Sequence, residues 1–181
     1  MKFITGALPG IFLIEPTPFG DERGWFMRTF CKKEFLAINF TGEWVQMNHS
    51  FTKKSGTVRG LHYQNHPFSE IKLVRCVTGK VFDVVVDIRK DSPTFLQWMS
   101  VELSSENKKT IFIPQGFAHG FQTLSDNTEL VYSHSEYYEP EGETALFYAD
   151  PALKIQWPLP VADLSERDKN NPLLNNNFEG I

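Results

Sequence analysis

The chain has 181 residues, of which 41% are hydrophobic and 22% charged, and its formal net charge is −4 at pH 7. This length fits one domain with a substantial core, and this composition excludes an intrinsically disordered chain. The sequence has no strongly basic balance, which argues against general nucleic-acid binding, although an anionic small ligand needs only a few local cations.

The cysteines and the N-terminus bear on the compartment. Cys31 and Cys76 are too few for a disulfide framework, so we interpret them as free thiols in a reducing environment. The first twenty residues lack the shape of a signal peptide, because their apolar run is short and carries Pro9, Gly10 and Glu15. No window reaches the roughly 18 apolar residues of a membrane span. We therefore expect a cytoplasmic protein with no membrane partner.

Short segments rich in β-branched and aromatic residues follow one another along the chain, separated by turns that contain Gly, Pro, Asn or Asp. Alternation in the segment 80–88 places Phe82, Val84 and Val86 on one face, and Asp83 and Val85 on the other. The strands predicted in chain order are 10–16, 44–52, a strand around His62, 72–79, 80–88, 98–103, 109–114, 120–125 and 128–138.

Helical signals are few. Residues 31–40 have helical character, and a second short helix is predicted after Leu164 with Ser165 as its N-cap. Many strands with almost no helix predict an all-β sandwich or barrel. No repeat or linker divides the chain, so we expect a single domain over residues 1–181 with a polar tail from about residue 159, either wrapped on the surface or partly mobile.

The stretch from 59 to 70 contains residues that could ligate a metal. His62, His66 and Glu70 follow one another at intervals of four, and His119 lies further along the chain. Eight residues of extended strand span about 26 Å, which is too far for three ligands of one ion. A turn at Pro67 could bring them closer. We favour a site without a metal and keep a metal-binding protein as an alternative.

His62 also suits a general base, since a neutral histidine whose tautomer is fixed by a carboxylate accepts protons near neutral pH. In an ideal strand it shares a face with Gln64, and Arg59 lies on the opposite face unless a bulge at Gly60 redirects it. An isolated strand histidine is more often a structural residue, so the base hypothesis depends on the polar residues that accompany it.

Three other polar residues admit both a structural and a functional interpretation. Lys72 shares a face with Val74 and Cys76, and an inward lysine could stabilise an oxyanion. Arg23 is either a charged residue of a surface turn or, if it lies beside a cleft, a residue that binds phosphate. Tyr132 is as compatible with a structural role as with an acid. None of these signals is specific alone.

Taken in order, a series of segments closely resembles the dTDP-4-dehydrorhamnose 3,5-epimerase family. The resemblance runs from about Gly10 to Pro158 and is strongest from Arg59 to Phe121. The segments are DERGWF, QMNHS, VRGLHYQ, KLVRCVTGKVFDVVVDIRKDSPTF, VELSSENKKTIFIPQGFAHGF, EYYEP and ADPALKIQWP. The resemblance implies a cupin-type jelly-roll barrel, a homodimer, no metal and no cofactor. It also implies a dTDP-linked 4-keto-6-deoxyhexose as substrate, with dTDP-4-dehydro-6-deoxyglucose converted to dTDP-4-dehydro-L-rhamnose.

The resemblance also implies catalytic roles. The hydrogens on C3 and C5 flank the C4 ketone, so removing one gives an enolate with its charge on O4. His62 is implied as the base, Asp150 as the carboxylate that orients it, and Lys72 as the group that stabilises the enolate oxygen. Tyr132 is implied as the acid that returns a proton from the opposite face.

Substrate contacts are implied in the same way. Arg23 and Arg59 correspond to residues that meet the diphosphate, and Tyr138 to a residue that stacks on thymine. The remaining implied contacts are Gln46, Asn48, His119 and Glu143.

The sequence departs from the family pattern at Arg28, where an acidic residue is usual, and at Ser133, where a lysine is usual and His134 follows. Two alternatives therefore stay open. The first is a C3-only epimerase or ketoisomerase of a related deoxysugar nucleotide on the same scaffold. The second is a non-catalytic or metal-binding cupin.

Overall fold

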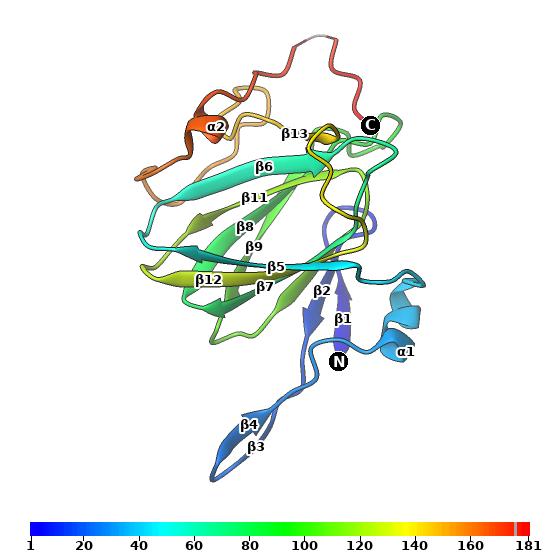
Figure 1. Ribbon diagram of the computed structural model, residues 1–181, viewed down its shortest axis with the longest axis vertical. Helices are drawn as coiled ribbons and strands as arrows, with labels where there is room; N and C mark the ends of the chain where they lie inside the picture. Colours follow the sequence, from blue (N-terminus) through cyan, green and yellow to red (C-terminus); the bar gives the residue numbers. More distant parts are fainter. Residues whose placement is uncertain (176) are drawn as a thin grey trace.

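The computed structural model describes residues 1–175 and 177–181, and two antiparallel sheets dominate it (Figure 1). The six-stranded sheet contains, in spatial order, β1 (Lys2–Thr5), β2 (Phe12–Glu15), β10 (Thr110–Ile113), β7 (Lys72–Thr78), β12 (Thr128–His134) and β5 (Gln46–Thr52). The five-stranded sheet contains β13 (Glu143–Ala145), β6 (Val58–Gln64), β11 (Phe117–Thr123), β8 (Lys80–Asp87) and β9 (Trp98–Ser104). The predicted all-β barrel is confirmed, and each strand predicted in the sequence overlaps one of these strands.

The main core lies between the two sheets and is built by strand alternation. Val74 and Cys76 of β7 pack there against Val81 and Val85 of β8, and all four side chains are fully buried. The other face of β8, which includes Val84, Val86 and Phe82, packs in a second cluster on the outside of the five-stranded sheet. The two faces predicted for the segment 80–88 are therefore confirmed.

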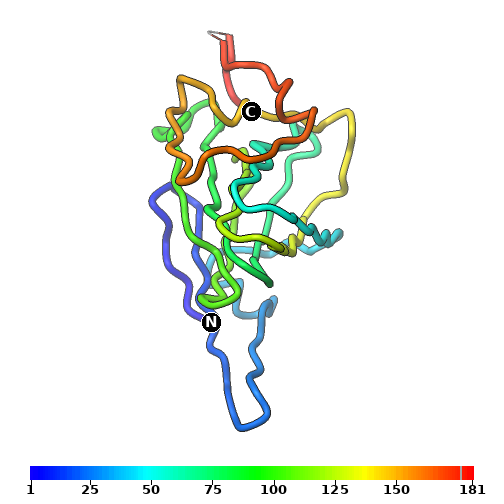
Figure 2. Tube along the Cα trace, turned by 90° about the vertical axis from the view of Figure 1, so that its left-hand side faces the viewer, coloured from blue at the N-terminus to red at the C-terminus, as the bar shows by residue number. Residues whose placement is uncertain are grey.

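A hairpin that the sequence did not predict projects from the barrel. Its strands β3 (Phe19–Asp21) and β4 (Gly24–Phe26) pair only with each other and extend away from both sheets (Figures 1 and 2). Phe19 and Phe26 are 71% and 72% exposed, and Trp25 is exposed as well. Three exposed aromatic side chains on one short hairpin are unusual for a surface that faces only water.

The helices are short. The predicted helix at 31–40 is α1 (Lys32–Phe35) followed by the 3₁₀ helix η1 (Leu36–Ile38), and the second prediction is α2 (Glu166–Lys169). Ser165 caps α2, since its hydroxyl accepts the backbone N–H of Asp168 at 3.0 Å, as predicted. In the described part of the chain, no helix is long and apolar enough to cross a membrane.

The last part of the chain lies over the outer face of the five-stranded sheet. Leu174, Phe178 and Ile181 pack against the second cluster, and the backbone N–H of Ile181 donates to the carbonyl of Ile88 at 2.8 Å. α2 belongs to the same stretch and lies beside β6 (Figure 1). The tail thereby brings a C-terminal segment to the back of the strand that carries His62.

Candidate active site

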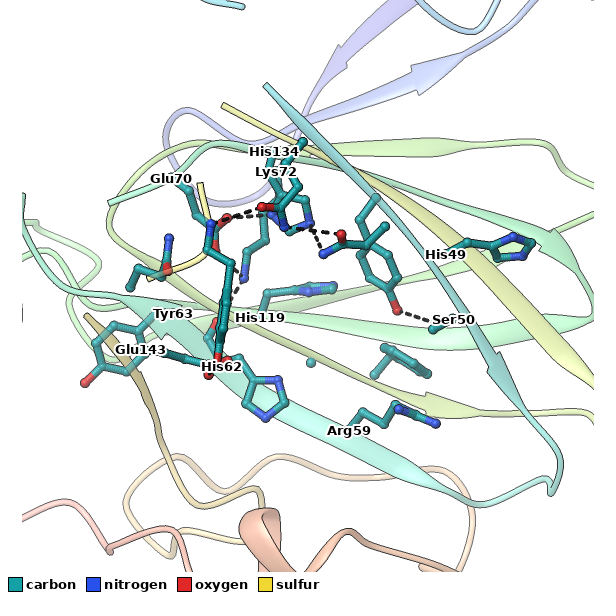
Figure 3. A pocket seen from close by; sticks show the side chains of 17 residues that line it. His49, Ser50, Arg59, His62, Tyr63, Glu70, Lys72, His119, His134 and Glu143 are labelled. Carbon is teal, nitrogen blue, oxygen red and sulfur yellow. Dashed lines mark hydrogen bonds and ion pairs between the residues drawn. The ribbon is translucent and has the colours of Figure 1, made fainter. Parts of the chain in front are cut away.

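A cavity of about 300 Å³ opens between the two sheets. Figure 3 shows its side chains, which come from both walls of the barrel. Of the predicted site residues it collects His62, Tyr132, Lys72, Gln46, Asn48, Arg59, His119, Tyr138 and Glu143, and it leaves out Asp150 and Arg23.

A bulge in β6 turns both Arg59 and His62 toward the cavity. His62 pairs with His119 of β11, whereas Arg59, three residues earlier, pairs with Phe121, so β6 carries one extra residue over this interval. Gly60 occupies that interval with φ +128°, and a Cβ there would meet the Cα of Gly120 at 2.5 Å. Glycine is therefore required, and the bulge removes the alternation that would have placed Arg59 on the other face.

The carboxylate that contacts His62 is Asp168 of α2. The Nε2 atom of His62 lies 2.7 Å from Oδ1 of Asp168, whose side chain is 3% exposed. Burial alone would raise the pKa of Asp168, but its hydrogen bond and charge interaction with His62 outweigh burial and lower the pKa. An ionised Asp168 accepts a hydrogen bond from the Nε2–H group of the imidazole, which leaves Nδ1 as the ring nitrogen that can take up a proton.

The prediction that Asp150 orients His62 is wrong. Its carboxylate accepts backbone N–H groups instead, from Ala152 at 2.8 Å and from Leu174 at 2.6 Å. Asp150 thus closes its own turn and fixes the C-terminal tail. It is 2% exposed and does not line the cavity.

Sequence reasoning missed Asp168 because it is 106 positions from His62. The available signal was the Ser165 cap, which places Asp168 in the first turn of a short helix. An acidic residue there is equally explained by the helix itself. Only the path of the tail reveals that α2 packs against β6.

The opposite wall carries Tyr132 of β12. Its hydroxyl lies 3.0 Å from the hydroxyl of Ser50 on β5, the neighbouring strand. Burial raises the pKa of Tyr132, so the phenol keeps its proton at neutral pH. His62 and Tyr132 therefore reach one cavity from opposite sheets.

Lys72 lies on the same wall as Tyr132, in β7, and is 8% exposed. The predicted face is confirmed, because Lys72 shares the interior side of β7 with Val74 and Cys76. Its ammonium group lies 3.1 Å from Oε1 of Glu70 and 3.4 Å from the carbonyl oxygen of His62. An ammonium group has three N–H donors, so one stays available for a ligand in the cavity.

Glu70 and His134 are among the titratable cavity residues that were not predicted as site residues. Glu70, which was considered from the sequence as a candidate metal ligand, contacts Lys72 and also Nδ1 of His134 at 2.5 Å. Both Glu70 and His134 have side chains that are 10% exposed. The signal was present, since an acid two residues before Lys72 and a histidine two residues after Tyr132 were both visible in the sequence.

His119 forms a further histidine–carboxylate pair inside the cavity. Its Nε2 atom lies 2.9 Å from Oδ2 of Asp83, and both side chains are buried. Burial raises the pKa of Asp83, and the nearby His119 and Lys72 oppose this effect. The pair fixes the orientation of the His119 ring at the interior end of the site.

The open end of the cavity is held together from α2. Arg167 binds the Glu143 carboxylate through both guanidinium NH2 groups at 2.7 and 2.8 Å, and the Tyr138 hydroxyl donates to Glu143 at 2.7 Å. Arg59 donates from Nε to the Thr52 hydroxyl at 3.1 Å. Tyr138 stays half exposed, so its ring is accessible to a ligand.

Arg23 does not join the site of its own chain. It lies at the turn of the β3–β4 hairpin, its side chain is 89% exposed, and its guanidinium contacts Asp21. The prediction that it contacts the substrate's diphosphate can hold only if the hairpin enters the cavity of a second copy.

The side chains also bear on the metal alternative. Among residues 1–175 and 177–181, no group of three or more His, Cys, Asp and Glu side chains is arranged to hold a metal ion. His66 is exposed in the loop between β6 and β7 and does not line the cavity.

Fold and cavity together define a cupin-type barrel with a cavity lined by titratable side chains from both sheets. The family model for dTDP-4-dehydrorhamnose 3,5-epimerase matches residues 5–176. A dTDP-4-dehydrorhamnose 3,5-epimerase from Shigella flexneri is 48% identical over 171 residues, which cover 94% of each chain. The chain belongs to this family and is therefore an isomerase.

Two solved structures illustrate the likeness. A dTDP-6-deoxy-D-glucose-3,5-epimerase from Legionella pneumophila, in complex with dTDP-4-keto-L-rhamnose, has a TM-score of 0.91 and 44% identity, covering 95% of this chain and 92% of that one. A 3'-monoepimerase from Streptomyces bikiniensis, in complex with dTDP-quinovose, has a TM-score of 0.85 and 34% identity, covering 92% and 85%.

Proposed function

We propose that this protein converts dTDP-4-dehydro-6-deoxyglucose to dTDP-4-dehydro-L-rhamnose by inverting C3 and C5. The observation that carries the proposal is the pair of groups on opposite walls: His62, oriented by Asp168, and Tyr132, kept protonated by burial. An inversion through a planar enolate needs a base on one face and an acid on the other, and the cavity supplies both.

The first step is proton abstraction at a carbon next to the ketone. Nδ1 of His62 takes the proton, the C–H electron pair forms the carbon–carbon double bond of the enolate, and the carbonyl π pair moves to O4. The imidazolium that forms is stabilised by the buried carboxylate of Asp168, which stays ionised.

The enolate oxygen needs a positive partner. Lys72 retains one N–H beyond those that contact Glu70 and the His62 carbonyl, and this donor can bind O4 as negative charge develops there. A buried ammonium group acts in a low-dielectric site, where its effect on an anion is greater than in water.

Reprotonation completes each inversion. The Tyr132 hydroxyl gives its proton to the opposite face of the enolate carbon, and the O4 electron pair re-forms the ketone as the carbon–carbon double bond takes up that proton. The phenolate then regains a proton from solvent, and the His62 imidazolium releases the abstracted proton to solvent. Ser50, 3.0 Å from the phenol oxygen, stabilises the phenolate while it exists.

We also propose that the protein works as a homodimer in the cytoplasm. Support for a dimer comes from the exposed aromatic hairpin, since Arg23 on its turn could meet the diphosphate only in the cavity of another copy. Support for a reducing compartment comes from Cys31 and Cys76, which are both free thiols. Sedimentation of the intact protein tests the first statement, because a monomer at micromolar concentration would contradict it.

Incubation with dTDP-4-keto-6-deoxyglucose in deuterated water tests the reaction. We expect deuterium at both C3 and C5, read by NMR, together with a product of L-rhamno configuration. Label at C3 alone would favour the C3-only alternative, which the likeness to a 3'-monoepimerase supports. No label would contradict both. Stoichiometric zinc, iron or nickel that survives dialysis would instead favour the metal-binding alternative.

A further inference from the structure

Glu70 and His134 are buried titratable side chains that the proposed mechanism leaves without a role. They connect two parts of the site: on one side Lys72, and on the other Asn48 and Gln46. Figure 3 shows Glu70, Lys72 and His134 grouped at one end of the cavity.

The direction of the hydrogen bonds in this group follows from one backbone N–H. The N–H of Tyr138 can only donate, and it lies 3.0 Å from Gln46, so the Gln46 atom that faces it is the carbonyl oxygen. The Gln46 amide NH2 then donates to the Asn48 carbonyl oxygen at 3.2 Å. The remaining Asn48 group is its NH2, which points to Nε2 of His134 at 3.2 Å.

This direction fixes the tautomer of His134. Because Asn48 donates to Nε2, that nitrogen carries a lone pair, and the proton of the neutral ring is on Nδ1. Nδ1–H donates to Oε2 of Glu70, and the other oxygen of Glu70 accepts from Lys72. Each donor in the series therefore meets an acceptor, from the Tyr138 backbone to the Lys72 ammonium.

The charge state of Glu70 agrees with this series. Burial alone would raise its pKa, but the hydrogen bond from His134 and the charge of Lys72 lower it, so the carboxylate is ionised. A carboxylate can accept from both neighbours at once, whereas a glutamine has only one acceptor oxygen. The position therefore needs a carboxylate to hold His134 and Lys72 together.

We propose that Glu70 and His134 are positioning residues that couple the nucleotide end of the cavity to the enolate end. Glu70 holds the Lys72 ammonium so that its third N–H points at O4, and His134 anchors the Asn48 amide and, through it, Gln46. Asn48 and Gln46 are proposed substrate contacts. This inference rests on the proposed function, because it assigns the pair to the same reaction.

A double-mutant cycle on the intact protein tests the coupling. The variants are Glu70→Gln, His134→Ala and the double substitution, with the exposed Glu106→Gln and His66→Ala as matched controls. Each cavity variant should lower kcat for deuterium exchange by about 10- to 100-fold, because a small displacement of a catalytic group has effects of this size. Glu70→Gln should change the Kd for dTDP by less than about threefold, since Lys72 acts on the enolate and not on the nucleotide.

The double variant should be no slower than the slower single variant, because the two side chains act through one series of hydrogen bonds. Losses that multiply, or single variants that match the controls, would overturn the proposal. A wild-type protein that exchanges no deuterium would contradict the proposed function instead, which separates the two failures.

A second measurement uses only the wild-type protein and so does not depend on whether a variant folds. Long-range ¹⁵N–¹H NMR of the wild-type imidazoles reports which nitrogen carries the proton. Neutral His134 should be the Nδ1–H tautomer. The Nε2–H form would overturn the series of hydrogen bonds and with it the proposed coupling.

Discussion

The two walls of the cavity are built in different ways. On the six-stranded sheet, Tyr132 and Ser50 are placed by adjacent strands, and their contact follows from the antiparallel register of β12 and β5. On the five-stranded sheet, His62 depends on a bulge in its own strand and on Asp168 from the C-terminal tail. The wall that carries the proposed acid (the acid wall) is thus a local product of strand pairing, and the wall that carries the proposed base (the base wall) is assembled from distant segments.

Because of this difference, the two walls should not be equally sensitive to substitutions. Strand pairs on the acid wall are supported along their whole length by ladder hydrogen bonds. The base wall is held at its back by a four-residue helix that cannot be stable by itself and depends on tertiary packing. Substitutions that loosen the tail should therefore impair proton abstraction more than reprotonation.

Loss of the base should produce the largest effect. His62→Ala removes the proposed base, so deuterium exchange at C3 and C5 should fall by about 10³-fold or more. Exchange is measured by NMR in deuterated water. The exposed His66→Ala serves as the control, and an exchange rate equal to that of the wild type would show that another residue is the base.

Variants of two buried aspartates distinguish the carboxylate that orients His62 from one that only stabilises the fold. Asp168→Asn should lower kcat by about 10²-fold, since the amide can stabilise the wrong tautomer and cannot stabilise the imidazolium. Asp150→Asn should leave kcat per folded molecule within about threefold while lowering Tm, because its partners are backbone N–H groups. The reverse pattern would restore Asp150 as the partner of His62.

On the acid wall, Tyr132→Phe should separate exchange from inversion. Proton abstraction by His62 continues, so deuterium exchange should stay within about tenfold of the wild type, whereas inversion should slow by about 10²-fold. Both rates are followed in the same NMR sample. Equal loss of both would mean that Tyr132 supports the structure and not the proton transfer.

The smallest effect on rate is expected at Asp87, which ends β8 and does not line the cavity. Arg89, Ser92 and Thr94 hydrogen-bond its buried carboxylate, and although burial opposes them they lower its pKa from 3.8 to about 2. Because the folded pKa is depressed, this stabilisation is present above pH 3.8 and is lost as the pH falls through about 2.

The corresponding variant is Asp87→Asn. It should lower the free energy of unfolding by about 2 kcal/mol at pH 7 and by much less near pH 2. Its exchange rate per folded molecule should equal that of the wild type. Urea titration at the two pH values measures the first effect, and a pH-independent loss of stability would show that packing and not charge is responsible.

Much of the barrel was predictable because the alternation of side chains between the two faces of a strand can be read from a short segment of sequence. The segment 80–88 already displayed its two faces, and Lys72 was correctly placed on the face of its strand that carries Val74 and Cys76. The hairpin at 19–26 was missed because its aromatic residues are exposed and form no part of the core. A pattern that depends on burial cannot detect a strand pair whose aromatic side chains stay exposed.

The sequence by itself determined the all-β fold, the strands and most residues of the cavity, because strand alternation and family motifs are written along the chain. Tertiary structure alone decided which aspartate serves His62. Asp150 and Asp168 are both acids near the end of the chain, and backbone N–H groups occupy the first while packing of α2 on β6 delivers the second. Tertiary structure likewise decided that Glu70 and His134 meet, because 64 positions separate two side chains that only strand pairing brings together.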